Sequence, residues 1–201
     1  MTVPPKGDAE SVPLNPDGRK AAAAWDPAKD EAAGDQCKAF GAAAIVRRPG
    51  RMHITWQDDN TLKVEFDAGS QTRLFHFGTP QGTGGDWQGV SVASWDIPGT
   101  VMTRGSFGLA AGGNLNRGGA LKVVTNKMKA GYLRINGIPY SENASVTDFF
   151  DRFDIPNGDS LLLVATEVTD PTYLTAPFWT STHFKKQNDA TGWSPTPCSV
   201  K

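Results

Sequence analysis

The sequence predicts a mainly β protein, an antiparallel up-and-down barrel of about 8 to 10 strands that follows a short helical lead-in. Two observations predict this fold. From Arg51 onward, apolar and polar residues alternate with a period of two, in runs rich in Val, Thr, Phe, Trp and Leu. Gly, Asn, Asp or Pro separates most of these runs, and helix-length crossovers are absent, so the sheet is expected to be antiparallel and either closed or sandwiched.

The chain divides into two expected parts. Residues 1–35 form an N-terminal arm, which is extended in its Pro-rich first part and helical in the Ala-rich stretch 16–33. Pro27 interrupts that stretch, because proline disfavours a helical conformation at the residue before it, so one or two short helices are expected. Residues 36–201 form the barrel domain.

Nine candidate strands follow one another in the barrel domain. They are residues 51–57, 61–67, 71–77, 87–97, 120–128, 131–137, 145–155, 160–170 and 178–186. One segment, residues 98–120, has seven glycines and little periodicity. A loop of this length is expected to be either a flexible insertion or a functional lid.

Charge and hydropathy exclude some partners. The formal net charge is −1, so no global field attracts nucleic acid, and nucleic-acid binding is not expected. No stretch approaches the roughly 18 to 20 apolar residues that cross a bilayer, and nothing resembles a signal peptide, although the Pro-rich start is compatible with a mature secreted terminus. The oligomeric state cannot be predicted from these features.

The two cysteines, Cys37 and Cys198, lack the CxxC spacing of a zinc or redox site. They form either a disulfide or two free thiols. A disulfide would close a loop of about 160 residues and stabilise the fold by roughly 4 to 5 kcal/mol on the chain-entropy estimate. It would also favour an oxidising compartment.

The register of the first three strands decides which faces the histidines occupy. With three-residue loops at 58–60 and 68–70, His53 lies opposite Glu65, and Glu65 lies opposite Arg73. That face is then the polar one, and the apolar face carries His76 as its lone polar ring. A one-residue change in either loop would reverse the faces.

Metal and nucleophile motifs are lacking in the sequence. His53, His76 and His183 have no metal-binding spacing, so no metal site is predicted. There is no GxSxG elbow and no phosphate-binding glycine motif, and no cofactor is predicted.

The segment 131–153 has residues that suit ligand binding. Tyr132 and Arg134 share one face of a strand, Tyr140 follows a turn, and Asp148 lies on the next strand. Tyr and Arg can orient a carboxylate or carbonyl, and Asp148 can act as a base. The alternative is an Arg-Asp-Arg ladder that fixes strand register.

Four segments resemble a group of bacterial proteins of unassigned function, most of which carry signal peptides. The segments are ALKVVTNKM, NGIPYSENASVTDFFDRF, SLLLVATEVTDPTYLTAPF and THFKKQNDATGWSPTPC. The resemblance covers most of residues 20–198, and Asp170-Pro171 and Ala176-Pro177-Phe178 match well. It implies a secreted or periplasmic lipocalin-like barrel and brings no reaction or catalytic residue. The glycine-rich stretch 98–120 departs from the compact spacing of the group.

Two functions of different classes remain. The first is the binding of a small hydrophobic or aromatic molecule inside the barrel. Its candidate ligand-binding residues are Trp56, Phe66, Leu74, His76, Trp87, Trp95, Tyr132, Arg134 and Tyr140. The second is a cofactor-independent lyase, isomerase or hydrolase for such a molecule, with His76 or His53 as base and Asp148 assisting.

Overall fold

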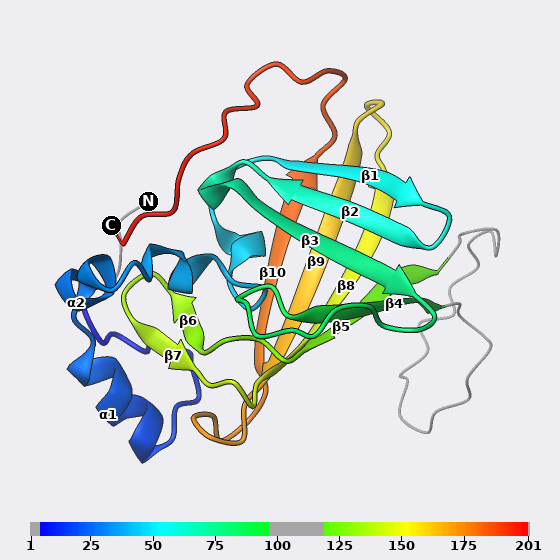
Figure 1. Ribbon diagram of the computed structural model, residues 1–201. Coiled ribbons are helices and arrows are strands. Elements are labelled where there is room, and N and C mark those ends of the chain that lie inside the picture. The colour runs from blue at the N-terminus through cyan, green and yellow to red at the C-terminus, as the bar shows by residue number, and fades with distance from the viewer. Residues whose placement is uncertain (1–4, 97–118, 201) are drawn as a thin grey trace.

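The computed structural model describes residues 5–96 and 119–200 (Figure 1). Its α-helices are α1 (Pro16–Ala24) and α2 (Pro27–Ala32), and its 3₁₀ turns are η1 (Gln36–Phe40), η2 (Ile45–Arg47) and η3 (Ala68–Ser70). Its strands are β1 (Met52–Asp58), β2 (Thr61–Phe66), β3 (Gln71–Phe77), β4 (Val90–Asp96), β5 (Ala120–Asn126), β6 (Gly131–Arg134), β7 (Ile138–Tyr140), β8 (Ser145–Asp154), β9 (Ser160–Thr169) and β10 (Phe178–Lys185). No helix among the described residues is long and apolar enough to cross a bilayer.

Eight strands form one mixed sheet, in the order β1-β2-β3-β4-β5-β8-β9-β10, which curls into an open half-barrel (Figure 1). The mainly β class is confirmed, but the prediction of an all-antiparallel closed barrel is wrong in two respects. The strands β3 and β4 pair in parallel, and β1 and β10 stay at opposite edges of the sheet. Parallel pairing requires a long return connection, and residues 78–89 provide it between β3 and β4.

All nine predicted strands are present, and β7 is the strand that the sequence did not predict. It pairs with β6 in a separate two-stranded sheet. A three-residue strand with Pro139 at its centre is too short for alternation to be visible in the sequence. The glycine-rich segment 98–120 lies mostly outside the described residues. The prediction of a flexible insertion or a functional lid therefore also lies outside them.

Two short helices form in the lead-in, as predicted. Each begins with a proline at its first position and a side-chain cap before it. The Asn15 side chain accepts a hydrogen bond from the backbone N–H of Gly18, and that of Asp26 accepts one from Ala28. The lead-in packs against the β6–β7 hairpin, where one hydrophobic cluster joins Val12, Leu14 and Ala22 to Leu133 and Ile138.

A second hydrophobic cluster fills the concave face of the large sheet. Ile45 and Val46 of η2 pack there against Val64, Phe75 and Val123. The helices α1 and α2 lie toward one end of this sheet (Figure 1). The opposite end, to which β1, β3 and β4 point, is called the far end below (Figure 1).

The predicted register is correct between β1 and β2 and wrong by one residue between β2 and β3. His53 pairs with Glu65 as expected, but Glu65 pairs with Thr72, and Arg73 pairs with Val64. The turn contains Asp67 in addition to the three residues of η3. Arg73 therefore lies on the concave face and His76 on the convex face, the reverse of the prediction.

The η3 turn depends on Gly69, which has φ of +73° and lies against the buried ring of Phe40. A Cβ at this position would come within 2.5 Å of Phe40 Cδ1. We expect Gly69→Ala to lower the free energy of unfolding by about 2 kcal/mol, because backbone strain and overpacking add. Gly34 has φ of +75° and open space around a built Cβ, so Gly34→Ala is the control for strain alone. Equal losses in urea unfolding would contradict the packing argument.

Candidate functional site

Three aromatic side chains form a row across the far end of the concave face. We call these side chains the aromatic row; they are Trp56 of β1, Phe77 of β3 and Trp95 of β4. The ring centroids of Trp56 and Phe77 are 5.5 Å apart, and those of Phe77 and Trp95 are 5.8 Å apart. Trp56 is 56% exposed and Trp95 is 55% exposed. Large apolar side chains grouped in this way on a surface are typical of interaction sites.

Strand register places the aromatic row on the concave face. Trp56 pairs with Leu62, which pairs with Phe75, and both partners belong to the concave core. Ile54, on the same face of β1, is 38% exposed. The row is therefore the solvent-facing continuation of the hydrophobic core.

Apolar side chains continue from the row across the concave face. Phe75 is fully buried, and its ring centroid is 5.5 Å from that of Phe150 on β8. Leu162 of β9 and Phe184 of β10 are partly buried against the same cluster. The far end of the concave face is thus mainly apolar on both sides of the curl.

The concave face also carries a buried polar network beside its apolar residues. The guanidinium of Arg73 donates to Asp148 at 2.9 Å and to Thr125 at 3.0 Å, and both side chains of the ion pair are fully buried. Asp148 also accepts from the Thr166 hydroxyl at 2.6 Å, and Ser91 bonds Thr125 at 2.7 Å. These contacts use both carboxylate oxygens of Asp148, which suits a structural role better than that of a solvent-exposed base.

The predicted histidines lie away from the concave face. His53 is exposed on the convex face, where its Nδ1 is 3.3 Å from Glu65, and the pKa of Glu65 is lowered chiefly by its hydrogen bond from Lys63. His76 is buried on the convex face with Thr61 Oγ1 3.3 Å from its Nδ1. His183 pairs with Leu163 on β9 and also points to the convex side. The described residues contain no cluster of three metal-binding side chains.

The other predicted ligand-binding residues are dispersed. Phe66 lies in the concave core near Phe40, and Leu74 lies on the convex face. Trp87 lies before β4 with Lys129 Nζ 4.5 Å from its ring centroid. The Tyr140 side chain is buried in the lead-in cluster, and burial raises its pKa.

Tyr132 and Arg134 of β6 do not meet Asp148. The Tyr132 hydroxyl donates to Asp30 at 2.7 Å, and burial together with this bond raises its pKa. Arg134 donates to the Ser11 hydroxyl at 3.3 Å. The predicted Arg-Asp-Arg ladder is replaced by the pair of Asp148 with Arg73, while Arg152 contacts Asp154.

The sequence reasoning placed three residues of the concave face wrongly: Arg73, Phe75 and Phe77. All three were assigned to the polar face because the β2–β3 turn was counted one residue too short. A count that included Asp67 in the turn would have put Phe77 beside the two tryptophans.

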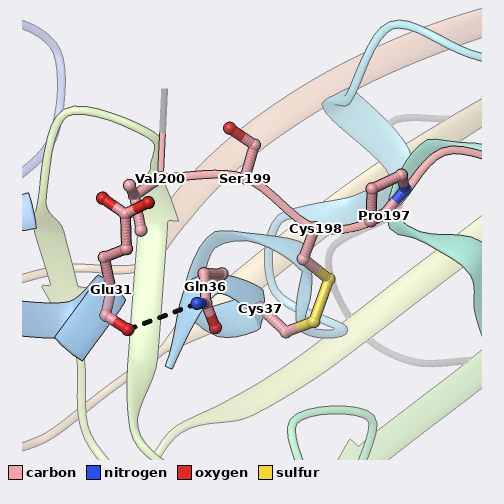
Figure 2. A pocket seen from close by; sticks show the side chains of 7 residues that line it. All are labelled: Glu31, Gln36, Cys37, Pro197, Cys198, Ser199 and Val200. Atoms are coloured by element: carbon pink, nitrogen blue, oxygen red, sulfur yellow. Dashed lines mark hydrogen bonds between the residues drawn. A yellow bond between two sulfur atoms is a disulfide. The ribbon is translucent and has the colours of Figure 1, made fainter. Parts of the chain in front are cut away.

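A separate cleft lies where the C-terminal segment crosses η1. Figure 2 shows its lining: Glu31, Gln36, Cys37, Pro197, Cys198, Ser199 and Val200, around a volume of about 520 Å³. The predicted disulfide between Cys37 and Cys198 is present in this cleft. The cleft is open, and its lining mixes polar residues with the disulfide, a proline and a valine, without an aromatic side chain.

Fold and site together define a mainly β protein with an open, curled sheet and an aromatic-lined concave face. Comparison of the chain with family models, with curated proteins and with solved structures finds no match in any of the three. No family is therefore identified, and the resemblance to the group of secreted bacterial proteins stays a prediction.

Proposed function

We propose that this protein binds a small hydrophobic or aromatic molecule on the concave face of its half-barrel, at the aromatic row. The single observation that supports this most is the pair of half-exposed tryptophans that flank Phe77 there. A hydrophobic ligand binds where it covers apolar surface that is otherwise exposed to water. The aromatic row provides such surface next to the buried core.

The geometry of the row favours a flat or extended apolar ligand. The planes of neighbouring rings are inclined by only 34° and 30°, so the three rings follow one another in similar orientations along the row. Aromatic contacts of this kind contribute about 0.5 to 1.5 kcal/mol each beyond the area that they bury. A ligand that contacts all three rings would gain from each of them.

The enzymatic alternative has less support. It required His53 or His76 as base beside the ligand, and both side chains lie on the convex face. Asp148 lies on the concave side but is fully buried with Arg73. Binding without chemistry is therefore the function that we propose.

The disulfide supports a secreted or periplasmic location for this binding activity. Disulfides persist in oxidising compartments and are rare in the cytosol. The bridge between Cys37 and Cys198 joins η1 to the C-terminal segment across 161 positions of the chain.

The test is a titration with N-phenyl-1-naphthylamine, an uncharged aromatic probe whose fluorescence rises in apolar surroundings. We expect wild-type protein to bind it, and Trp56→Ala and Trp95→Ala each to weaken binding about tenfold, because each removes one stacking surface and its apolar area.

Trp179→Ala is the matched control, because Trp179 is 54% exposed and stacks on Phe149, on the convex face. It should bind the probe as wild type does. Failure of wild type to bind, or an equal loss in the Trp179 variant, would contradict the proposal. A native mass spectrum of the purified protein would then show whether a natural ligand is retained.

A further inference from the structure

Two arginines meet at one aromatic ring at the start of β10, beside β6 (Figure 1). The guanidinium carbon of Arg47, at the end of η2, is 5.2 Å from the centroid of the Phe178 ring. That of Arg134, at the end of β6, is 5.9 Å from the same centroid. Phe178 itself is buried, so both cations lie over a ring that is held within the core.

Among the described residues, every hydrogen bond from these two guanidinium groups goes to a neutral acceptor. Arg47 donates from Nη2 to the carbonyl oxygens of Ala43 and Leu133, and from Nη1 to Thr180 Oγ1 at 3.4 Å. Arg134 donates to Ser11 Oγ at 3.3 Å. Within residues 5–96 and 119–200, neither arginine forms an ion pair, whereas Arg73 and Arg152 each contact a carboxylate.

The electrostatics of this site are those of an uncompensated positive charge. Burial, and to a smaller extent the like charge of Arg134, lower the pKa of Arg47 to about 10, while Asp148 acts in the opposite direction. Asp148 is already paired with Arg73, so it offsets the charge of Arg47 only in part. A partly buried cation without a counter-ion is unfavourable, and an anion that binds there would relieve it.

We propose that Arg47 and Arg134 bind an oxyanion, a phosphate or carboxylate group of a small molecule, with the Thr180 hydroxyl as a third donor. Arginine suits this ligand because its planar fork donates two parallel hydrogen bonds to two oxygens. The Thr180 hydroxyl accepts from Arg47 and keeps its own proton to donate. This site is distinct from the aromatic row at the far end and does not rest on the proposed function.

The experiment is isothermal titration calorimetry of the full chain with inorganic phosphate and, separately, with acetate, each against chloride at equal ionic strength. Binding of phosphate supports a phosphate ligand, and binding of acetate alone supports a carboxylate ligand. We expect Arg134→Gln to weaken the binding about tenfold, since it removes a charge-assisted hydrogen bond to the anion. Arg134 is chosen because Arg47 also caps two backbone carbonyls, and its loss would disturb folding.

Arg152→Gln is the control, because Arg152 is exposed and pairs with Asp154 of the same strand, β8, away from Phe178. It should leave anion binding unchanged. Thr180→Val keeps both charges, and we expect a smaller loss from it. The proposal is overturned if wild type releases no heat with phosphate or acetate beyond that with chloride, or if Arg134→Gln binds as wild type does.

Discussion

Replacement of Asp148 by alanine is expected to lower the free energy of unfolding by about 3 to 5 kcal/mol, because it leaves the Arg73 guanidinium as a buried charge without its partner. Both side chains are fully buried, and their contact is 2.9 Å long. The change also removes the acceptor of the Thr166 hydroxyl. Urea unfolding followed by circular dichroism measures the loss.

Two further variants separate the buried charge from other effects of the substitution. Asp154→Ala breaks an ion pair of the same kind with Arg152, but that pair is exposed, so we expect a change of no more than about 0.5 kcal/mol. The double change Arg73→Met and Asp148→Leu removes both charges and should recover much of the stability that Asp148→Ala loses. A double variant less stable than Asp148→Ala would show that the ion pair itself, rather than the orphaned charge, dominates.

The elements of this fold were predictable because their sequence signals are local. Alternating runs mark the strands, and Asn15 and Asp26 before prolines mark the helix starts. The β1–β2 register was also predictable, because the short turn and the alternation of apolar and polar residues together fix which residues pair.

The β2–β3 register was not predictable because distant residues determine the length of that turn. Asp67 leaves the strand to accept a hydrogen bond from the backbone N–H of Arg51 at 2.7 Å. Its carbonyl oxygen accepts another from Thr196 at 2.9 Å. Neither partner is visible in the local sequence, yet the one-residue difference exchanges the faces of Arg73 and His76.

The parallel pairing of β3 and β4 was not predicted either. Residues 78–86 were expected to join two antiparallel strands, but the connection 78–89 carries the chain back so that β4 runs parallel to β3. For the candidate site, composition identified Trp56 and Trp95, and only the three-dimensional register places Phe77 between them.

Removal of the disulfide is the second large effect that we expect. Replacement of Cys37 and Cys198 by serine together should lower the free energy of unfolding by about 4 to 5 kcal/mol, because a bridge across 161 positions strongly restricts the unfolded chain. In a chain of this size the loss corresponds to a fall in Tm of about 10 to 20 °C. Thermal unfolding without reductant measures it.

The native state should keep its large sheet in this variant, since the bridge holds the C-terminal segment and no strand. Other contacts of the C-terminal segment are the hydrogen bond from the Thr196 backbone N–H to the Asp67 carbonyl oxygen, the hydrogen bond from the Ser70 hydroxyl to the Thr196 carbonyl oxygen, and the ring contact of Trp193 with His53. These exposed contacts are weak, so we expect faster amide exchange in residues 187–200 than in β2 or β8.

Reductant provides the internal control for the disulfide prediction. Dithiothreitol should lower the stability of wild-type protein to that of the serine variant and should leave the variant unchanged. If the variant lost less than about 1 kcal/mol, the entropy of the unfolded chain would not be the source of the stability, because the chain-entropy estimate depends on loop length and not on native contacts. The C-terminal segment would then depend on Thr196 and Trp193 for its position, and Trp193→Ala should release it without any change of redox state.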